Sequence, residues 1–356
     1  MKIAQVCPRF YPYIGGVETH VQEISTRLVE KGLGVEVLTT DPSGKLLKEE
    51  FINSLRIRRF RSWAPSEAFY FSWRLRRHLL ECSEDYDIVH AHSYHAFPAL
   101  YAAQAKRRNK LVFTPTYHGS GHTFFRSMLH IPYKFFAKKI FEKADKVICV
   151  SNYERDLVTN HLRVGKEKVA VVPNGIDLEE FRHLKRRSRD KKCRVILYVG
   201  RLEKYKGVDY LIKALPKLEN DVFLEIVGKG PYNRNLIGLA RRLGMENRVR
   251  FSQDLPRVEL LQMYTDADLF ASLSRHEAYG ICVAEALASG TPCIVTRSSA
   301  LGEWVDDENC FGVSSRTNLE ELVCCINNVM GRRVKRVKLP NWDETAEKLA
   351  RLYECC

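Results

Sequence analysis

The sequence has no long hydrophobic segment. A helix that crosses a bilayer needs about 18 or more consecutive apolar residues, and no such run occurs in the 356 residues of the chain. We therefore expect no transmembrane helix. Residues 1–8 read as an apolar strand of a folded domain, without the charged and then apolar regions of a signal peptide. These features favour a cytoplasmic protein.

The cysteines do not have the spacing of a metal site or a redox motif. The eleven cysteines include no pair with the Cys-x-x-Cys spacing of zinc sites and redox motifs. This argues against the common zinc-binding folds and thioredoxin-like enzymes. Because no secretion signal is visible, we expect free thiols in a reducing compartment.

Acidic residues are outnumbered by basic ones. The chain has 57 Lys and Arg against 43 Asp and Glu, a formal net charge of +14. Such an excess favours anionic partners, whether nucleotides, nucleic acid or an anionic membrane surface. Much of it lies in two blocks, residues 185–192 and 331–338, which are typical of solvated surface. No zinc-finger, RNA-recognition or helix-turn-helix pattern is present, so we expect no nucleic-acid partner.

Apolar strands alternate with amphipathic helices along both halves of the chain. Strands are predicted at 2–7, 35–39, 55–60, 87–91, 110–116, 146–150, 168–172, 194–199, 221–227, 248–251, 268–272, 293–296 and 311–314. Helices are predicted at 17–31, 67–82, 96–107, 132–143, 152–161, 208–218, 232–243, 257–265, 281–289 and 317–330. This alternation predicts an α/β fold of two doubly wound, Rossmann-like domains.

Breaks in this alternation of strands and helices indicate the domain boundaries. We expect an N-terminal domain over 1–178, a basic linker over 179–193 and a C-terminal domain over 194–340. Residues 341–356 form a terminal amphipathic helix. A chain of 356 residues suits two domains of ordinary size.

One stretch, residues 274–292, places two glutamates around the start of a helix. Because Gly280 is a poor helix interior, the helix is expected to begin just after it, with Glu277 in the loop and Glu285 one turn in. Eight residues at a helical rise span roughly 12 Å, so the two carboxylates can hold separate hydroxyl groups of one ligand. The helix N-terminus between them suits a phosphate. The alternative is structural, since carboxylates are common near helix N-termini.

Two cations follow the strand predicted at 194–199. Arg201 leaves the carboxyl end of that strand, and Lys206 precedes the next helix. A cation at a helix N-terminus opposes the helix dipole, so the arrangement makes better sense if both hold an anion. Around a diphosphate they would stabilise the charge that builds up on a leaving group.

The Glu-x7-Glu spacing of Glu277 and Glu285, together with Arg201 and Lys206 in this order, resembles the retaining glycosyltransferases of family four, which have the GT-B fold. The resemblance covers nearly the whole chain. It implies two Rossmann-like domains facing a cleft, with the terminal helix crossing back onto the N-terminal domain. It also implies that Glu277 binds the donor sugar and Glu285 the ribose of the nucleotide.

The resemblance assigns further residues to the donor site. His118 follows the strand at 110–116, where ligands of parallel sheets collect, and is expected beside the transferred sugar. Two glycines before a helix let the backbone approach an anion. The residues expected at the donor are Gly15, Gly16, Gly228, Leu255, Ala278, Tyr279, Gly280 and Glu285. A second histidine cluster, at 90–95, is not expected to hold a metal, although His92 is a candidate for the acceptor side.

No metal is expected at the site. The patterns Asp85-Tyr86-Asp87 and Asp266-Ala267-Asp268 lie at the amino ends of strands, the edge of the sheet away from the ligand, and we interpret them as caps and turns. Arg201 and Lys206 can replace the charge of a metal ion. The chain departs from the family at 297–303, where Ser299 and Ala300 replace a usual Gly-Gly pair and Glu303 is kept.

The function predicted is transfer of a hexosyl unit, with retention, from a nucleotide-diphosphate sugar to a hydroxyl of a glycan, lipid or lipid-linked acceptor. The resemblance implies that the leaving phosphate helps to deprotonate the acceptor. No paired carboxylates of the hydrolase kind are evident. Two alternatives stay open: a nucleotide-sugar epimerase on the same scaffold, and a non-enzymatic protein that binds nucleotide sugars.

Two stretches, 69–77 and 124–143, mix aromatic and basic residues within the N-terminal domain. A basic amphipathic face can lie on an anionic bilayer, which would place the protein on the cytoplasmic membrane face. The alternative is that these helices simply pack their aromatic residues on the sheet.

Overall fold

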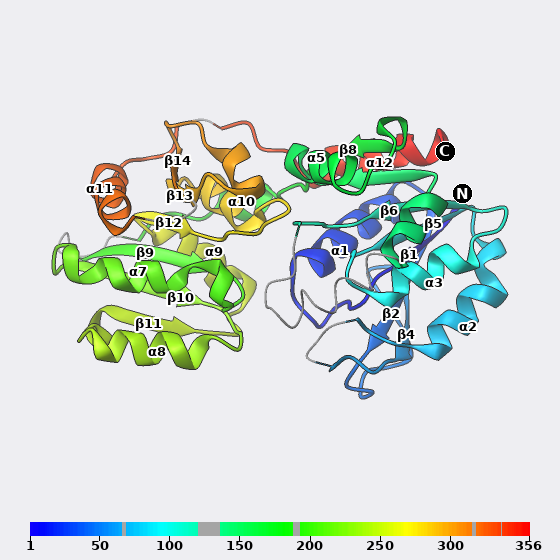
Figure 1. Cartoon of the computed structure of the whole chain (residues 1–356), viewed down its shortest axis with the longest axis horizontal. Coiled ribbons are helices and arrows are strands. Elements are labelled where there is room, and N and C mark those ends of the chain that lie inside the picture. Colours follow the sequence, from blue (N-terminus) through cyan, green and yellow to red (C-terminus); the bar gives the residue numbers. More distant parts are fainter. Residues whose placement is uncertain (66–68, 120–135, 188–192, 315–317, 336) are drawn as a thin grey trace. The chain divides into compact units, whose positions relative to one another are not determined.

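The computed structural model of the chain describes all residues except 66–68, 120–135, 188–192, 315–317 and 336. The described residues form two compact units (Figure 1). The first comprises Met1–Gly175 and Pro340–Cys356, and the second comprises Ile176–Leu339. The chain therefore returns to the first unit for its last helix.

The first unit is built on an eight-stranded sheet in the order β3-β4-β2-β1-β5-β6-β7-β8. Its strands are β1 Lys2–Val6, β2 Gly34–Asp41, β3 Glu49–Ile52, β4 Leu55–Arg61, β5 Ile88–His92, β6 Lys110–Thr114, β7 Lys146–Cys149 and β8 Val169–Val171. All neighbours are parallel except the edge strand β3, which runs antiparallel to β4. This doubly wound sheet confirms the predicted α/β class.

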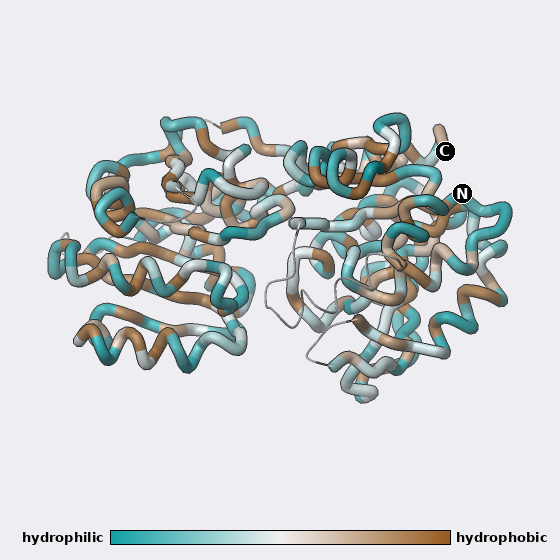
Figure 2. The backbone as a smooth tube through the Cα atoms, in the orientation of Figure 1, coloured by the Kyte–Doolittle hydropathy of each residue, from teal (hydrophilic) through white to brown (hydrophobic). Residues whose placement is uncertain are grey.

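Helices cover both faces of this sheet. They are α1 Gly16–Glu30, α2 Trp73–Cys82, α3 Phe97–Ala105, α5 Asn152–Asn160 and α12 Trp342–Glu354, and residues 136–143 are also helical. Two apolar cores result: α1 and α12 contribute to one, and α2, α3 and α5 to the other. In Figure 2 the tube is mainly brown along the central strands and alternates in colour along the helices, as amphipathic packing requires.

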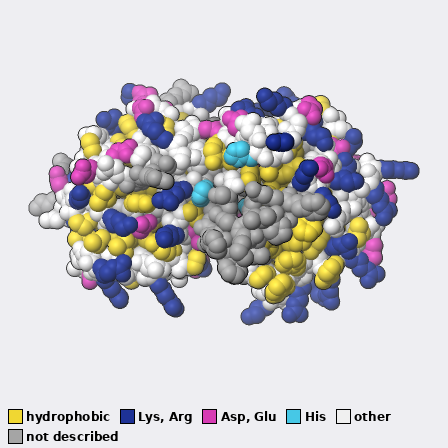
Figure 3. All heavy atoms as spheres, viewed as in Figure 1, with side chains coloured by type: hydrophobic (Ala, Val, Ile, Leu, Met, Phe, Trp, Pro, Cys, Tyr) yellow, Lys and Arg dark blue, Asp and Glu magenta, His cyan; other side chains and the backbone are white. Residues whose placement is uncertain are grey.

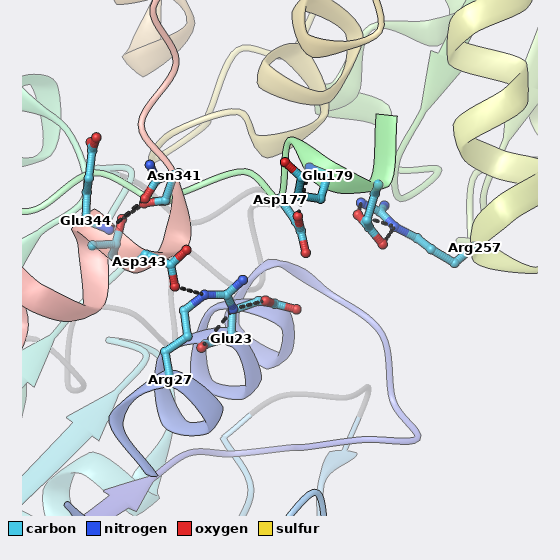
Figure 4. A network of polar contacts seen from close by, with 10 residues as sticks. Glu23, Arg27, Asp177, Glu179, Arg257, Asn341, Asp343 and Glu344 are labelled. Carbon is cyan, nitrogen blue, oxygen red and sulfur yellow. Dashed lines mark hydrogen bonds and ion pairs between the residues drawn. The ribbon is translucent and has the colours of Figure 1, made fainter. Parts of the chain in front are cut away.

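The terminal helix α12 packs beside α1. Its residues Trp342, Leu349 and Tyr353 are buried in the same core as α1. Arg27 on α1 donates to Asp343 at 3.0 Å, and Figure 4 shows this contact. The Asn341 side chain caps the helix by accepting from the backbone N–H of Glu344 at 2.7 Å.

The second unit has a six-stranded, fully parallel sheet in the order β11-β10-β9-β12-β13-β14. Its strands are β9 Arg194–Val199, β10 Val222–Val227, β11 Val249–Ser252, β12 Leu269–Ser272, β13 Cys293–Thr296 and β14 Cys310–Val313. Its helices are α6 Glu179–Arg182, α7 Val208–Ala214, α8 Asn233–Arg242, α9 Arg257–Asp266, α10 Ile281–Ala288 and α11 Leu319–Val329. One core lies under α7, α8 and α11, and the other under α9 and α10.

The segment predicted as a linker differs from that prediction. It contains helix α6, whose Phe181 is buried in the second unit. Arg186 pairs with Asp268, and the backbone N–H of Arg187 donates to Asp266 at 2.8 Å. Two of the cations of this segment therefore lie beside aspartates that precede β12, and residues 179–187 pack on the second unit.

Candidate functional site

The second unit brings Lys206 and Glu277 together at the carboxyl ends of two adjacent strands. Lys206 ends a short 3-10 turn, Lys204–Lys206, after β9, and Glu277 lies in the loop after β12. Gly207 allows this approach: its φ is +73°, and a Cβ atom there would lie 2.5 Å from the carbonyl oxygen of Leu273. The Lys206 ammonium group donates to the Glu277 carboxylate.

This ion pair is largely shielded from water. The Lys206 side chain is 15% exposed and that of Glu277 is 23% exposed. Burial alone would lower the pKa of Lys206, but the negative charge of Glu277 outweighs it and raises the pKa above its usual range. Lys206 is therefore a fixed cation, as an anion-binding role requires.

Arg201 lies in the same region but is more exposed. Its side chain is 47% exposed, and its guanidinium group is 3.4 Å from Glu203. The half-buried ring of Tyr205 has its centre 5.3 Å from the Lys206 ammonium group. Burial raises the pKa of Tyr205, and the charges of Lys206, Glu277, Glu203 and Arg201 also act on it. The structure thus groups both predicted cations with one of the two predicted glutamates.

Gly228 borders this region from the next strand. A Cβ atom on Gly228 would lie 1.9 Å from the carbonyl oxygen of Gly200, the residue before Arg201. Only glycine fits there, so the close approach of the loops after β9 and β10 depends on it. Leu255, after β11, is partly buried against the core under α9 and α10.

Helix α10 begins where the sequence predicted. Gly280 has a φ of +102° and precedes Ile281, the first helical residue, so Glu277 lies in the loop and Glu285 in the helix. Cys282, in the first turn, lies between the two glutamates in the sequence. Burial raises the pKa of its thiol to about 12, and the charges of Glu285, Glu277 and Lys206 also affect this pKa.

The side chains of Ala278 and Tyr279 are taken up in packing. Ala278 is buried, and the Tyr279 ring makes an edge-on contact with Trp304 at 5.2 Å between ring centres. Trp304 Nε1 also donates to the Tyr279 carbonyl oxygen at 2.8 Å. Any contact of these two residues with a ligand would therefore come mainly from the backbone.

Glu285 is held by two side chains of α9. Its carboxylate accepts from Arg257 at 2.5 Å and from the Tyr264 hydroxyl at 2.8 Å, and its side chain is only 8% exposed. Neither Arg257 nor Tyr264 is among the site residues predicted from the sequence. The available signal was a cation in the first turn of the helix predicted at 257–265, the same signal that identified Lys206.

The loop that departs from the family lies against Glu277. The backbone N–H of Ala300 is 3.3 Å from the carbonyl oxygen of Glu277. Ser299 has a φ of +60°, a conformation that favours glycine. Within the described part of the chain, the hydroxyls of Ser298 and Ser299 are buried without a hydrogen-bond partner.

The first unit holds the remaining predicted residues. Gly15 and Gly16 lie at the start of α1, and no atom lies within 4 Å of where a Cβ of Gly16 would stand. His118 is half-buried after β6, and its ring centre is 5.5 Å from that of His95, which follows β5. Thr116 before it has a φ of +50°, an uncommon conformation for a β-branched residue.

The suggestion that His92 lines an acceptor site is wrong. His92 is fully buried, and its Nε2 is 2.7 Å from the Gln5 side chain. Its neighbour His90 is also buried and contacts Tyr353 of α12 at 2.6 Å. Both histidines lie on β5, a central strand of the sheet with every residue buried. Helices cover both faces of this sheet, so side chains on either face of the strand are enclosed.

The aspartate pairs act as caps of the backbone. Asp87 accepts from the N–H of Lys2 at 2.7 Å, and Asp268 accepts from the N–H of Val195 at 2.9 Å. Both contacts lie at the amino ends of strands. Among the described residues, no cluster of three or more His, Cys, Asp or Glu side chains is suited to a metal ion. The described residues also include no helix long and apolar enough to cross a membrane.

Comparison with known proteins fits this architecture. A model of Glycosyltransferase Family 4 matches residues 14–180, and a model of Glycosyl transferases group 1 matches residues 180–354. A glycogen synthase of Mycobacterium tuberculosis is 30% identical over 86% of this chain and 80% of that protein. The phosphatidylinositol N-acetylglucosaminyltransferase GPI3 subunit of Saccharomyces cerevisiae is 24% identical over 99% of this chain and 79% of that protein.

Solved structures share the whole fold. Sucrose-phosphate synthase from Thermosynechococcus elongatus superposes with a TM-score of 0.82 at 19% identity, over 100% of this chain and 99% of that one. Anabaena HepE, in complex with UDP and glucose, superposes with a TM-score of 0.78 at 19% identity over 100% of both chains. The chain therefore belongs to the glycosyl transferases group 1, with the GT-B fold, and is a hexosyltransferase that uses a nucleotide-sugar donor.

Proposed function

We propose that this enzyme transfers a hexosyl unit with retention at the anomeric carbon and without an essential metal ion. The observation that carries the proposal is the pairing of Lys206 with Glu277 at adjacent strand ends, with Glu285 following in α10. A cation fixed beside a carboxylate suits a ligand that has an anionic diphosphate next to a sugar rich in hydroxyls. The relative Anabaena HepE was determined with UDP and glucose, which supports a ligand of this kind.

In this proposal each residue acts on one part of the donor. Lys206 and Arg201 neutralise the diphosphate as the bond between the anomeric carbon and the phosphate oxygen breaks. Glu277 and His118 hold the transferred sugar, and Glu285 holds the ribose. The backbone around Gly15, Gly16, Gly228, Leu255, Ala278, Tyr279 and Gly280 completes the donor contacts.

The acceptor hydroxyl attacks from the face that the phosphate leaves. Its oxygen forms the new bond to the anomeric carbon, and its proton passes to the departing phosphate, so the configuration is retained. Lys206 stays protonated throughout because of Glu277. Positive charge on Lys206 and Arg201 supplies what a metal ion supplies in other transferases.

We further propose a lipid or lipid-linked acceptor at an anionic membrane surface on the cytoplasmic side. In the first unit, Trp73 of α2 is 78% exposed and nearby Trp63 is 68% exposed. Arg77 is 81% exposed on the same helix. Figure 3 shows hydrophobic and basic side chains gathered over β4 and α2. Of the second aromatic and basic stretch, 124–143, residues up to 135 lie outside the described part of the chain.

The central test is a screen of nucleotide sugars with the purified enzyme, scored by nucleotide released. Release that depends on Lys206 and Glu277 supports the transferase. An epimerase would instead convert the nucleotide sugar into an isomer without releasing nucleotide. Binding with neither release nor conversion, with acceptor sugars and lipids supplied, would favour a binding protein. Proton NMR of the product's anomeric centre tests retention, and a product of inverted configuration would refute it.

A further inference from the structure

Two neighbouring side chains orient the carboxylate of Glu285. Its two carboxylate oxygens accept from different donors, Arg257 at 2.5 Å on Oε1 and Tyr264 at 2.8 Å on Oε2. The side chain is 8% exposed, so few of its conformations remain open. Both donors come from α9, which packs against α10.

Arg257 is itself held from a second side. Its Nη2 donates to Glu180 of α6 at 2.7 Å, and its Nε lies 3.2 Å from each oxygen of the same carboxylate. Figure 4 shows Arg257 extending from the first turn of α9 toward α6. The fork of the guanidinium group thus joins Glu180 and Glu285, a bidentate geometry that a lysine cannot reproduce.

Arg257 stays positively charged in this position. Burial alone would lower its pKa, but the hydrogen bond to Glu180 and the charge of Glu285 raise the pKa above the usual range. Tyr264 is fully buried and can only donate its hydroxyl proton to an ionised carboxylate. Arg257 and Tyr264 therefore fix the direction of the Glu285 carboxylate.

A carboxylate can accept about four hydrogen bonds. Two of these are used by Arg257 and Tyr264, which leaves two acceptor positions on Glu285 for a ligand. Two neighbouring hydroxyls on one ring, such as the 2′- and 3′-hydroxyls of a ribose, match this number.

We propose that Arg257 and Tyr264 are positioning residues that aim Glu285 at the ribose diol and thereby make the enzyme selective for ribonucleotides over deoxyribonucleotides. This inference rests on the proposed role of Glu285 in the function above. Glu180 supports it by holding Arg257 from α6. The selectivity comes from orientation, because neither residue needs to touch the nucleotide.

The test measures nucleotide selectivity by calorimetric titration. Among UDP, GDP and ADP, the diphosphate that the wild-type enzyme binds best is compared with its 2′-deoxy and 3′-deoxy analogues. We expect the wild type to prefer the ribonucleotide by about tenfold or more, as one or two hydrogen bonds to a charged group imply. Arg257→Met and Tyr264→Phe should each reduce this preference to about threefold or less, while affinity for the deoxy analogues changes less than about twofold.

Two further variants sharpen the result. Arg257→Lys should restore little of the preference, because it keeps the charge and loses the fork. Arg250→Met removes an exposed cation that lies 3.8 Å from Glu225 in the same unit and should leave the preference unchanged. Thermal unfolding without nucleotide checks that each variant is folded, and Tyr264→Phe, which removes one oxygen, is informative even if Arg257→Met does not fold.

Each other outcome would refute a distinct claim. Equal weakening of ribonucleotide and deoxy analogues would mean that Arg257 and Tyr264 act on the diphosphate or the fold, and tighter binding by Arg257→Met would mean that Arg257 blocks Glu285. A wild-type enzyme without ribose preference would refute the role of Glu285 in the proposed function. Failure to bind any of the three diphosphates, with release of none in the donor screen, would refute the proposed function itself.

Discussion

Replacing Lys206 by Met removes its ammonium group but keeps most of the length and apolar surface of the side chain. In the ion pair, the Lys206 side chain is 15% exposed and the Glu277 side chain is 23% exposed. The contribution of the pair to the free energy of unfolding should therefore lie between that of a surface pair and that of a buried one. Breaking it should destabilise the second unit by about 1–3 kcal/mol, because Glu277 keeps an uncompensated charge. The loss in transition-state stabilisation should be larger, about 2–4 kcal/mol, or roughly 30- to 1,000-fold in turnover.

The double variant Lys206→Met with Glu277→Gln separates the two effects. With neither charge present, stability should recover toward that of the wild type, and the two single losses in stability should not add. Turnover should stay low, since the diphosphate has lost its cation. Urea unfolding gives the stability, and nucleotide release at saturating donor gives the turnover. If the double variant regains turnover along with stability, the pair is a structural ion pair and the proposed role of Lys206 is wrong.

Four further predictions address other parts of the molecule. Chelation with EDTA should leave activity intact, and a loss that Mg²⁺ or Mn²⁺ restores would contradict the metal-free mechanism. Glu285→Ala should weaken binding of the bare nucleoside diphosphate by roughly 1.5–3 kcal/mol, whereas Glu277→Ala should mainly weaken binding of the complete donor. Equal losses of diphosphate affinity in the two variants would show that the two glutamates do not bind separate parts of the donor. Cosedimentation with anionic vesicles should decrease with salt and in a Trp73→Ser and Arg77→Gln double variant, and equal binding to neutral vesicles would refute an electrostatic surface. Burial lowers the pKa of His20 from 6.5 to about 4, although His20 Nδ1 donates a hydrogen bond to Asn174 Oδ1 that acts in the opposite direction. The unfolded chain therefore takes up a proton first as the pH falls, and stability present above pH 6.5 should decrease by roughly 2 kcal/mol near pH 5 from this residue. His20→Asn should reduce the decrease measured by urea unfolding, and an unchanged slope would contradict the assignment.

Strands and helices with a strong apolar period were predictable from the sequence. The start of α10 is the clearest case, because Gly280 can take a φ of +102° that other residues avoid. The positions of Glu277 and Glu285 relative to the helix followed from that single residue. Arg201 and Lys206 were predictable for a similar reason, since a sheet of parallel strands brings its carboxyl ends to one edge.

Elements whose sequence signal is weak or misleading were predicted less well. The helix predicted from residue 67 begins at Trp73, since Ser72 caps it by accepting from the N–H of Leu75 at 3.3 Å, and Phe69 has a φ of +66°. Strand β3, Glu49–Ile52, was missed because it lies at the sheet edge and buries little. Helix α6 was read as linker because basic residues follow it, and their aspartate partners are about eighty residues away in the sequence.

Pairing between charged side chains was the part of the site that could not be predicted. Spacing in the sequence shows that a glutamate lies near a helix start, but not which cation faces it. Arg257 and Glu285 are separated by 28 positions, and they meet because α9 packs against α10. The burial of His92 was missed for a related reason: a histidine after a strand looks available to a ligand until the neighbouring Gln5 and the surrounding core are placed around it.

Both glutamates proposed to bind the donor already have a cation at the carboxylate, Lys206 for Glu277 and Arg257 for Glu285. Ligand hydroxyls must therefore use the acceptor positions that remain, and the gain on binding is smaller than an unpaired carboxylate would give. A single substitution at either pair removes a ligand contact and also leaves an uncompensated charge in a shielded position. Loss of activity in one variant alone would fit a structural as well as a binding role. Comparison of each single variant with its charge-free double variant separates the roles, because only the structural cost is relieved when the second charge is removed.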